Sequence, residues 1–193
     1  MSLGGRVAHR ACVVWFYGLS GAGKTTIARI VESRLVAFGC KTFLLDGDLV
    51  RRGLSSDLGY SEADRKENLR RAAEVAALLA DAGFVVVSAF ITPRHSDRQR
   101  IREVLTRYPL VEAFVDTPID VAESRDVKGL YARARQGKIR DFTGVDAPFD
   151  VPIKPDLRLN TIDHDADTLA DRLIGELFAR QLLEGTRAGT NQM

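Results

Sequence analysis

The stretch Cys12–Thr26, CVVWFYGLSGAGKTT, decides the fold of this chain. Its first part, Cys12–Tyr17, is a run of apolar, β-branched and aromatic residues, which is typical of a buried strand. The run stops at Gly18, where a G-x-x-x-x-G-K-T string begins, and a helical pattern of apolar residues follows from Ile27. We therefore predict a strand, a glycine loop and a helix in direct succession.

This succession makes the glycine string a candidate phosphate-binding loop. Gly18, Gly21 and Gly23 allow the backbone N–H groups to approach a polyphosphate closely, and the start of the next helix attracts anions. Lys24 is placed to reach the β- and γ-phosphates, and the Thr25 hydroxyl to ligate Mg²⁺. An ordinary glycine-rich turn is the alternative. The flanking strand and helix favour a nucleoside triphosphate site.

Composition limits the class of protein. The chain has 193 residues, 45% of them hydrophobic and 28% charged, with a net charge of +2, so we expect one soluble domain and neither a nucleic-acid nor a membrane partner. Cys12 and Cys40 form no metal-binding or disulfide pattern, and with the lack of a signal peptide they favour a cytoplasmic location. We expect a flexible lead-in over residues 1–10, a kinase domain over 11–184 and a flexible tail over 185–193.

Strand and helix signals alternate along the chain. Further strands are expected over Lys41–Asp46, Phe84–Phe90, Val111–Asp116 and Leu157–Asn160. Helices are expected over Leu49–Leu54, from the Ser61 capping signature to Gly83, and over Ser96–Arg107, Ile119–Gly137 and Asp165–Glu184. The alternation predicts an α/β fold with a central parallel sheet and helices on both faces. The loops that follow the strands then share one edge, where ligands bind.

Polar residues follow the predicted strands at that edge. Asp46 and Asp48 can accept a hydrogen bond from a substrate hydroxyl or hold a water on Mg²⁺, although Asp-Gly-Asp is also turn chemistry. Arg65 and Asn68 share one helix face and would make an anion clamp; a surface arginine is the alternative. The tripeptide Ile91–Pro93 is expected to face the same cleft.

The segment Arg125–Arg140 carries six basic residues against one acidic residue, the clearest local charge excess in the chain. A solvated helix is the ordinary interpretation, and a mobile lid that closes over polyphosphate is the functional one. Phe142, just beyond this segment, and Tyr60 are candidates to stack on a base, with simple packing as the alternative.

Together these segments resemble the adenylylsulfate kinase family, whose members have the P-loop NTPase fold. The resemblance runs from about Val13 to Leu183 and rests on GLSGAGKTT, LDGDLVRRGL, DLGYSEADRKENLRR, AFITP and RDVKGLYARARQGKIRDFTGVDAPFDVP. It implies transfer of the γ-phosphoryl group of MgATP to the 3′-hydroxyl of adenosine 5′-phosphosulfate. The products would be 3′-phosphoadenosine 5′-phosphosulfate and ADP. The alternatives are a kinase of the same fold with another nucleotide acceptor, or a non-catalytic nucleotide-binding domain of a sulfurylase–kinase fusion.

The resemblance also implies roles for individual residues. ATP would be bound by Gly18, Leu19, Ser20, Gly21, Ala22, Gly23, Lys24, Thr25, Thr26 and Arg125, with Mg²⁺ on Thr25. The acceptor would be bound by Asp46, Asp48, Arg51, Tyr60, Arg65, Asn68, Ile91, Thr92, Lys128 and Phe142, with its adenine between Tyr60 and Phe142. The catalytic candidates are Lys24, Asp48 and Thr92. Thr92 replaces a family serine that has been assigned a phosphorylated intermediate, but we favour direct in-line transfer.

Two positions depart from the family pattern. Leu49 stands where the family has asparagine, and Arg94-His95 replaces a pair that usually begins with an aromatic residue. These departures motivate the alternative of a different nucleotide acceptor. As partners, the resemblance implies small nucleotide substrates and either a homodimer or a fusion with ATP sulfurylase.

Overall fold

A parallel sheet forms the centre of the molecule. The structure is a computed structural model that describes residues 7–126 and 128–185. The strands of the sheet are β2 (Cys12–Tyr17), β3 (Thr42–Asp46), β4 (Val85–Ala89), β5 (Leu110–Asp116) and β6 (Leu157–Asn160). They are all parallel and lie in the order β3-β4-β2-β5-β6. The predicted α/β fold with a central parallel sheet is confirmed.

Helices cover both faces of this sheet, so alternate residues of β2 enter two separate cores. Cys12, Val14 and Phe16 pack on the side of α1 (Lys24–Ala37) and α7 (Ala166–Ala179). Val13, Trp15 and Tyr17 pack on the side of α3 (Glu62–Asp81) and α4 (His95–Val104). A strand buried on both faces must be apolar throughout, which explains the continuous apolar run of β2.

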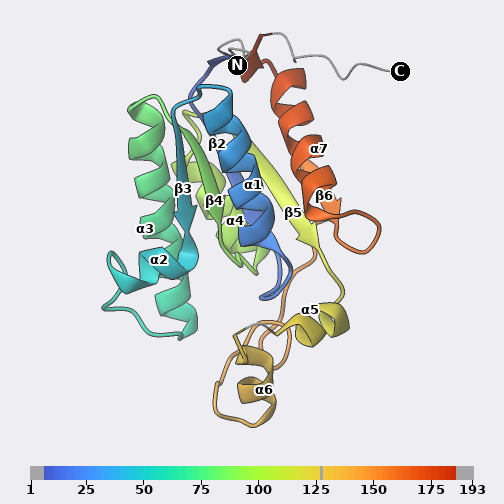
Figure 1. The fold of residues 1–193 in the computed structure, drawn as a ribbon. Coiled ribbons are helices and arrows are strands. Elements are labelled where there is room, and N and C mark those ends of the chain that lie inside the picture. The colour runs from blue at the N-terminus through green and yellow to red at the C-terminus, as the bar shows by residue number, and fades with distance from the viewer. Residues whose placement is uncertain (1–6, 127, 186–193) are drawn as a thin grey trace.

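The remaining helices lie at the carboxyl ends of the strands. The short helix α2 (Gly47–Arg52) follows β3 directly, and α5 (Ile119–Arg125) follows β5. Figure 1 shows α5 and α6 (Leu130–Arg135) extending beyond this end of the sheet, on the same side as the loop between β2 and α1. The strand topology thus brings the predicted phosphate loop and the predicted lid to one edge.

The basic segment differs from its predicted form. We expected one helix over Ile119–Gly137, but the chain forms α5 and α6 with a break between them. Gly129 has a left-handed φ of +63°, and the Asp126 carboxylate accepts hydrogen bonds from the N–H groups of Leu130 and Ala132 at 2.8 and 3.0 Å. These contacts start a new helix with its own cap. The residue types of the segment favour a helix throughout, so they do not reveal the break.

The two ends of the domain also differ from expectation. The helix predicted over Asp165–Glu184 ends at Ala179, and β7 (Leu183–Glu184) pairs antiparallel with β1 (Ala8–His9). Residues 8 and 9 therefore belong to a strand, whereas we expected a flexible lead-in over residues 1–10. Residues 1–6 of that lead-in and residues 186–193 of the predicted tail lie outside the described residues. A two-residue strand carries no periodicity that sequence reasoning can detect.

Both cysteines are buried free thiols, as expected for structural residues of the core. Within residues 7–126 and 128–185, no helix combines the length and the apolar character needed to cross a membrane.

Candidate active site

The glycine loop is held so close to neighbouring backbone that two of its positions accept no side chain. Gly18 has φ +150°, and a Cβ added there would lie 2.5 Å from the carbonyl oxygen of Val115. Gly21 has φ +71°, and its added Cβ would lie 2.6 Å from the carbonyl oxygen of Ala122. The loop is therefore pressed against β5 and α5, which fixes its shape before any nucleotide arrives.

Lys24 begins α1 and folds back over the loop. Its ammonium group donates to the carbonyl oxygens of Gly18 at 3.1 Å and of Leu19 at 2.6 Å. Burial, helped by the nearby Lys128, lowers the pKa of Lys24 from 10.5 to about 8, against the opposing effect of Asp48 and Asp46. A cation whose charge is destabilised in this way gains from an incoming polyanion.

Thr25 and Asp46 form an oxygen-rich corner beside the loop. The Thr25 hydroxyl donates to Asp46 Oδ2 at 3.0 Å, and Asp46 Oδ1 accepts the backbone N–H of Asp48 at 2.9 Å. Asp46 thus caps α2 while one of its oxygens lies beside the threonine predicted to bind metal. Hydroxyl and carboxylate oxygens are the ligands that Mg²⁺ prefers, so this corner suits it chemically.

The lid reaches the end of β3. Lys128, in the segment between α5 and α6, forms an ion pair with the Asp48 carboxylate. More than half of each side chain is exposed, so the pair is open to exchange with ligand groups. The structure brings Lys24, Asp48 and Lys128 together, and their binding and catalytic roles stay predictions.

Two arginines line the side of this cleft formed by α2 and α3. The Arg51 guanidinium lies 4.5 Å from the centre of the Tyr60 ring and donates to the Gly59 carbonyl at 2.8 Å. Arg65 donates to the Thr143 hydroxyl at 3.2 Å and to the Asp141 carbonyl, both beyond α6. Arg65 therefore joins α3 to the end of the lid and is not a freely solvated surface arginine.

Asn68, three residues after Arg65, is 5% exposed. Its Oδ1 atom has no hydrogen-bond partner among the described residues. Buried polar atoms are nearly always paired in folded proteins, so this oxygen is a candidate to accept a hydrogen bond from a ligand. The buried Asn68 and the half-buried Arg65 occupy the face of α3 that the i, i+3 spacing predicted.

The two candidate base-stacking rings have different surroundings. Tyr60 is 65% exposed and lies against Arg51. Phe142 is mostly buried in a small core of the lid, edge to face with Tyr131 at a centroid distance of 4.9 Å. Packing thus explains Phe142 in this structure, and a sandwich of adenine between the two rings stays a prediction.

The turn after β4 places Thr92 beneath the cleft. Thr92 is 1% exposed and has a left-handed φ of +45°, which is uncommon for a β-branched residue. Its hydroxyl accepts a hydrogen bond from Trp15 Nε1 at 2.9 Å. The carbonyl of Ile91 accepts the backbone N–H of Gly18 at 3.2 Å, so this turn touches the phosphate loop directly.

Sequence reasoning missed two side chains that support the phosphate loop and a third that supports the turn after β4. The Thr117 hydroxyl lies 3.0 Å from the carbonyl of Ala22 and 2.7 Å from the Thr161 hydroxyl. Tyr131 of the lid donates to the carbonyl of Ser20 at 3.0 Å, and Trp15 holds Thr92. Trp15 lies inside β2, Thr117 directly follows β5 and Tyr131 belongs to α6, segments that we interpreted only as core or lid, so no motif singled them out.

Arg125 lies on the other side of the loop. Its guanidinium is exposed and lies 3.4 Å from both the hydroxyl and the carbonyl oxygen of Thr161, after β6. The predicted contact of Arg125 with the ATP adenine stays a prediction. A hollow of about 690 Å³ adjoins the loop at Leu19, between the end of β5 and residues 144–151.

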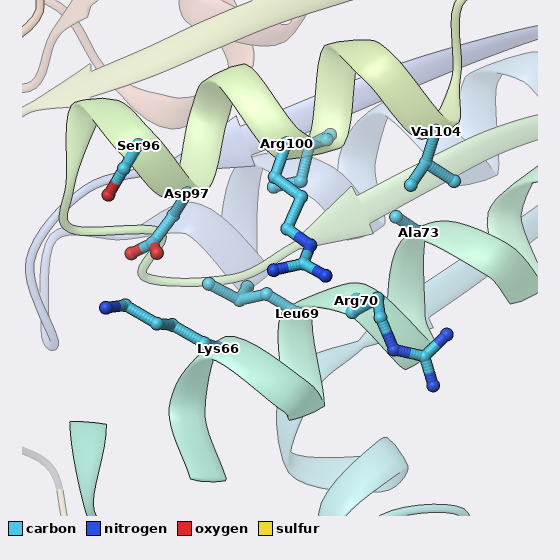
Figure 2. A pocket seen from close by; sticks show the side chains of 9 residues that line it. Lys66, Leu69, Arg70, Ala73, Ser96, Asp97, Arg100 and Val104 are labelled. Atoms are coloured by element: carbon cyan, nitrogen blue, oxygen red, sulfur yellow. The ribbon is translucent and has the colours of Figure 1, made fainter. Parts of the chain in front are cut away.

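A second, smaller cavity lies outside this cleft. It has a volume of about 170 Å³ and lies between α3 and α4 (Figure 2). In this view Lys66 extends from α3 toward Asp97 of α4, and Arg100 projects between the two helices. Lys66 pairs with Glu62 at 2.7 Å and Arg70 with Glu67 at 2.8 Å, so two of its cations are already neutralised within their own helix.

Comparison with known proteins identifies the family. The family model for adenylylsulphate kinases matches residues 10–160. The adenylyl-sulfate kinase of Marinobacter nauticus is 50% identical over 176 residues, which cover 91% of this chain and 88% of that protein. The chain belongs to the adenylylsulphate kinase family. The predicted family, the P-loop kinase fold, the enzyme class and the adenylylsulfate kinase function are confirmed.

Two further relatives of this adenylylsulphate kinase bear on its site and its partners. A solved structure of the Mycobacterium tuberculosis APS kinase, in complex with AMPPNP and APS, has a TM-score of 0.86 and 46% identity, over 89% of this chain and 99% of that one. The bifunctional enzyme NodQ of Azospirillum brasilense is 51% identical over 91% of this chain, which corresponds to 28% of NodQ. Sequences similar to this chain thus make up most of one relative and about a quarter of another.

Proposed function

We propose that this kinase transfers the γ-phosphoryl group of ATP to the 3′-hydroxyl of adenosine 5′-phosphosulfate, with release of ADP and 3′-phosphoadenosine 5′-phosphosulfate. The observation that carries the proposal is the meeting of Asp48, Lys128 and the phosphate loop at one sheet edge. Phosphoryl transfer needs alignment and neutralisation of charge more than a strong base, and this edge supplies both.

On the donor side, the loop N–H groups and Lys24 hold the β- and γ-phosphates. Lys24 exchanges its contacts with the Gly18 and Leu19 carbonyls for phosphate oxygens. Thr25, with Asp46 beside it, holds Mg²⁺ directly or through water. When bound, Mg²⁺ neutralises charge on the transferred group. Arg125 lies over the ATP adenine.

On the acceptor side, Asp48 orients and deprotonates the 3′-hydroxyl. Lys128 then leaves the Asp48 carboxylate and turns toward the anionic groups of the two nucleotides. Because the Asp48–Lys128 pair is largely solvent-exposed, its exchange costs about 1 kcal/mol or less. The acceptor itself is held by Arg51, Tyr60, Arg65, Asn68, Ile91, Thr92 and Phe142.

Transfer takes place directly between the two nucleotides, without a phosphorylated Thr92. Support comes from the surroundings of its hydroxyl, which is buried and already accepts the indole N–H of Trp15. A covalent carrier would need a hydroxyl exposed to both substrates and a base within hydrogen-bond reach. Thr92 therefore acts in binding.

A coupled assay of ADP release tests the reaction. We expect turnover with adenosine 5′-phosphosulfate and none with other adenine nucleotides, and we expect Asp48→Asn to lose turnover while ATP binding stays intact. Turnover with a different nucleotide would identify another acceptor. ATP binding without turnover on any acceptor would favour the non-catalytic alternative.

Partners and location are further proposals. We expect self-association of this chain, to be measured by light scattering coupled to gel filtration. A hexameric APS kinase of Thiobacillus denitrificans and the longer NodQ support assembly or fusion in this family. The two buried free thiols support a reducing, cytoplasmic location.

A further inference from the structure

The lid, Arg125–Arg140, continues into a loop over residues 141–151, which we count as part of it, and this far end is fastened to the turn after β4. Asp150 donates its backbone N–H to the Pro93 carbonyl at 2.8 Å. Its carboxylate accepts from the Arg94 guanidinium at 3.1 Å and from the backbone N–H of His95 at 3.0 Å. We call this contact between Thr92–His95, Arg98 and Asp150 the lid junction.

Arg98, on α4, lies at the centre of the lid junction. Its side chain is among the largest that are fully buried, with a residue exposure of 2%. One end of its guanidinium donates to the Thr92 carbonyl at 3.0 Å, and the other to the Asp150 carbonyl at 2.7 Å. The planar, forked guanidinium thereby bridges the turn beneath the cleft and the end of the lid.

The surroundings of Arg98 indicate more than packing. Its hydrogen bonds go to backbone carbonyls and to His95 Nδ1, at 2.9 Å, rather than to a carboxylate. Its guanidinium carbon lies 5.2 Å from the centre of the Tyr17 ring and 5.9 Å from that of Phe149. Burying a charge is costly unless its donors are satisfied, and an apolar residue would fill this space more cheaply.

The turn that Arg98 holds is itself strained. Thr92 keeps a left-handed φ of +45°, and such a conformation persists only when its surroundings impose it. Trp15 holds the side chain of Thr92 from the sheet, and Arg98 holds its carbonyl from α4. The position of this turn in the acceptor pocket therefore depends on both contacts.

We propose that Arg98 is a positioning residue that couples the lid to the acceptor-binding turn. A shift of the lid is transmitted through the Asp150 carbonyl and the guanidinium to Thr92, so lid closure and acceptor binding support each other. The inference deepens the proposed function, on which the acceptor role of this turn rests. ATP contacts the loop rather than the lid junction and depends on Arg98 much less.

The variant Arg98→Lys tests this coupling, because a lysine keeps the charge but cannot bridge both carbonyls. We expect the KM for adenosine 5′-phosphosulfate to rise about tenfold and the KM for ATP to change less than about twofold, the effect of losing one charge-assisted hydrogen bond on one side only. Trypsin cleavage within the lid, at Arg133, Arg135 or Lys138, should be faster in the ATP-bound variant than in the ATP-bound parent.

Arg102→Lys is the matched control. Arg102 lies one turn further along α4 and pairs with Glu112 at 2.7 Å, away from the lid junction. This control variant should leave the KM for adenosine 5′-phosphosulfate and the rate of trypsin cleavage in the lid unchanged, even if it lowers the unfolding temperature. If Arg98→Lys behaves like Arg102→Lys in both measurements, the coupling is wrong.

If Arg98→Lys fails to fold, the variant Asp150→Asn provides a second test of the proposal. It weakens the contacts with Arg94 and His95 without leaving a buried charge unpaired. The KM for adenosine 5′-phosphosulfate and the rate of lid cleavage should therefore both rise, but less than in Arg98→Lys. Absence of both would also overturn the proposal. Trypsin cleavage of the lid is measured without turnover, so it tests the coupling separately from the reaction. If the parent protein is inactive on adenosine 5′-phosphosulfate but the variants are still cleaved faster, the proposed function is wrong and the coupling stands.

Discussion

Single residues of the phosphate loop show how charge and space prepare a site for its ligand. The Lys24 ammonium is destabilised by burial and by Lys128, and it donates hydrogen bonds to the carbonyl oxygens of Gly18 and Leu19. Phosphate oxygens would restore its usual pKa. The free loop therefore holds electrostatic strain that a nucleotide relieves.

ATP binding should take up a proton at alkaline pH. The pKa of free Lys24 is about 8, and phosphates return it toward 10.5, so at about pH 9 the lysine is mostly neutral when free and charged when bound. At about pH 7 it is charged in both states, and uptake by this group vanishes. Calorimetry in two buffers of different ionisation enthalpy measures the difference. Persistence of the alkaline uptake in Lys24→Met would show that another group is responsible.

The Gly21→Ala variant should be far less stable than Gly137→Ala. Both glycines have left-handed φ values, +71° and +70°, so alanine strains either backbone by about 1 kcal/mol. Only at Gly21 does the added Cβ lie 2.6 Å from a backbone oxygen, whereas nothing lies within 4 Å at Gly137. The unfolding temperature should fall much further at residue 21 than at residue 137, and ATP affinity should fall at residue 21 only. Equal losses at the two positions would contradict the close approach of the loop to Ala122.

Thr92→Ala should retain turnover to within about tenfold, with most of the loss in the KM for the acceptor. The variant removes the hydroxyl that Trp15 holds but leaves Asp48 and Lys24 in place. Steady-state measurement of kcat and of the KM for the acceptor tests this prediction. A loss of about a thousandfold in kcat, with a stable fold, would instead indicate a covalent role for the hydroxyl.

At the scale of elements, the pattern of apolar residues predicted the strands and helices whose burial in the core determines their sequence, and little else. The inner strands β2, β4 and β5 were predictable because burial on both faces requires largely apolar runs, whereas the edge strands β3 and β6 are only partly buried. The break between α5 and α6 was not, because Asp126 and Gly129 act through backbone hydrogen bonds and a left-handed φ. The corner of Thr25 and Asp46 followed from the motif, whereas Trp15 and Arg98 resembled ordinary core and helix residues.

Asp126→Ala should loosen α6 without unfolding the sheet. The carboxylate caps α6 through the N–H groups of Leu130 and Ala132, and loss of such a cap costs about 1 kcal/mol. Hydrogen exchange of residues 130–135 should accelerate several-fold. Asp120→Ala, on exposed α5, serves as the control and should leave this exchange unchanged. Equal protection of α6 in both variants would mean that its stability comes from packing on Phe142.

At the scale of the whole molecule, polar contacts attach the lid to several parts of the domain besides the lid junction. Tyr131 contacts the phosphate loop, Lys128 the end of β3, and Arg65 joins α3 to the residues after α6. Each contact is a hydrogen bond or an exposed ion pair rather than an extended apolar interface. Contacts of this kind break and form readily, as opening and closing require.

Tyr131→Phe should loosen the phosphate loop while leaving the lid folded. The ring keeps its contact with Phe142, but the hydrogen bond to the Ser20 carbonyl is lost, at a cost of about 1 kcal/mol. We expect the KM for ATP to rise several-fold, because the lost contact supports the phosphate loop itself, and the unfolding temperature to fall by about 2–4 °C. An unchanged KM for ATP would mean that the phosphate loop keeps its shape without this contact.

The pairing of β1 with β7 brings the two ends of the domain side by side at the amino ends of the strands (Figure 1). A second enzyme joined to the chain at either end would thus be attached at the end of the sheet opposite the catalytic edge. Nucleotides could enter and leave without passing the attached protein, and a shared intermediate would have to travel around the sheet through solvent.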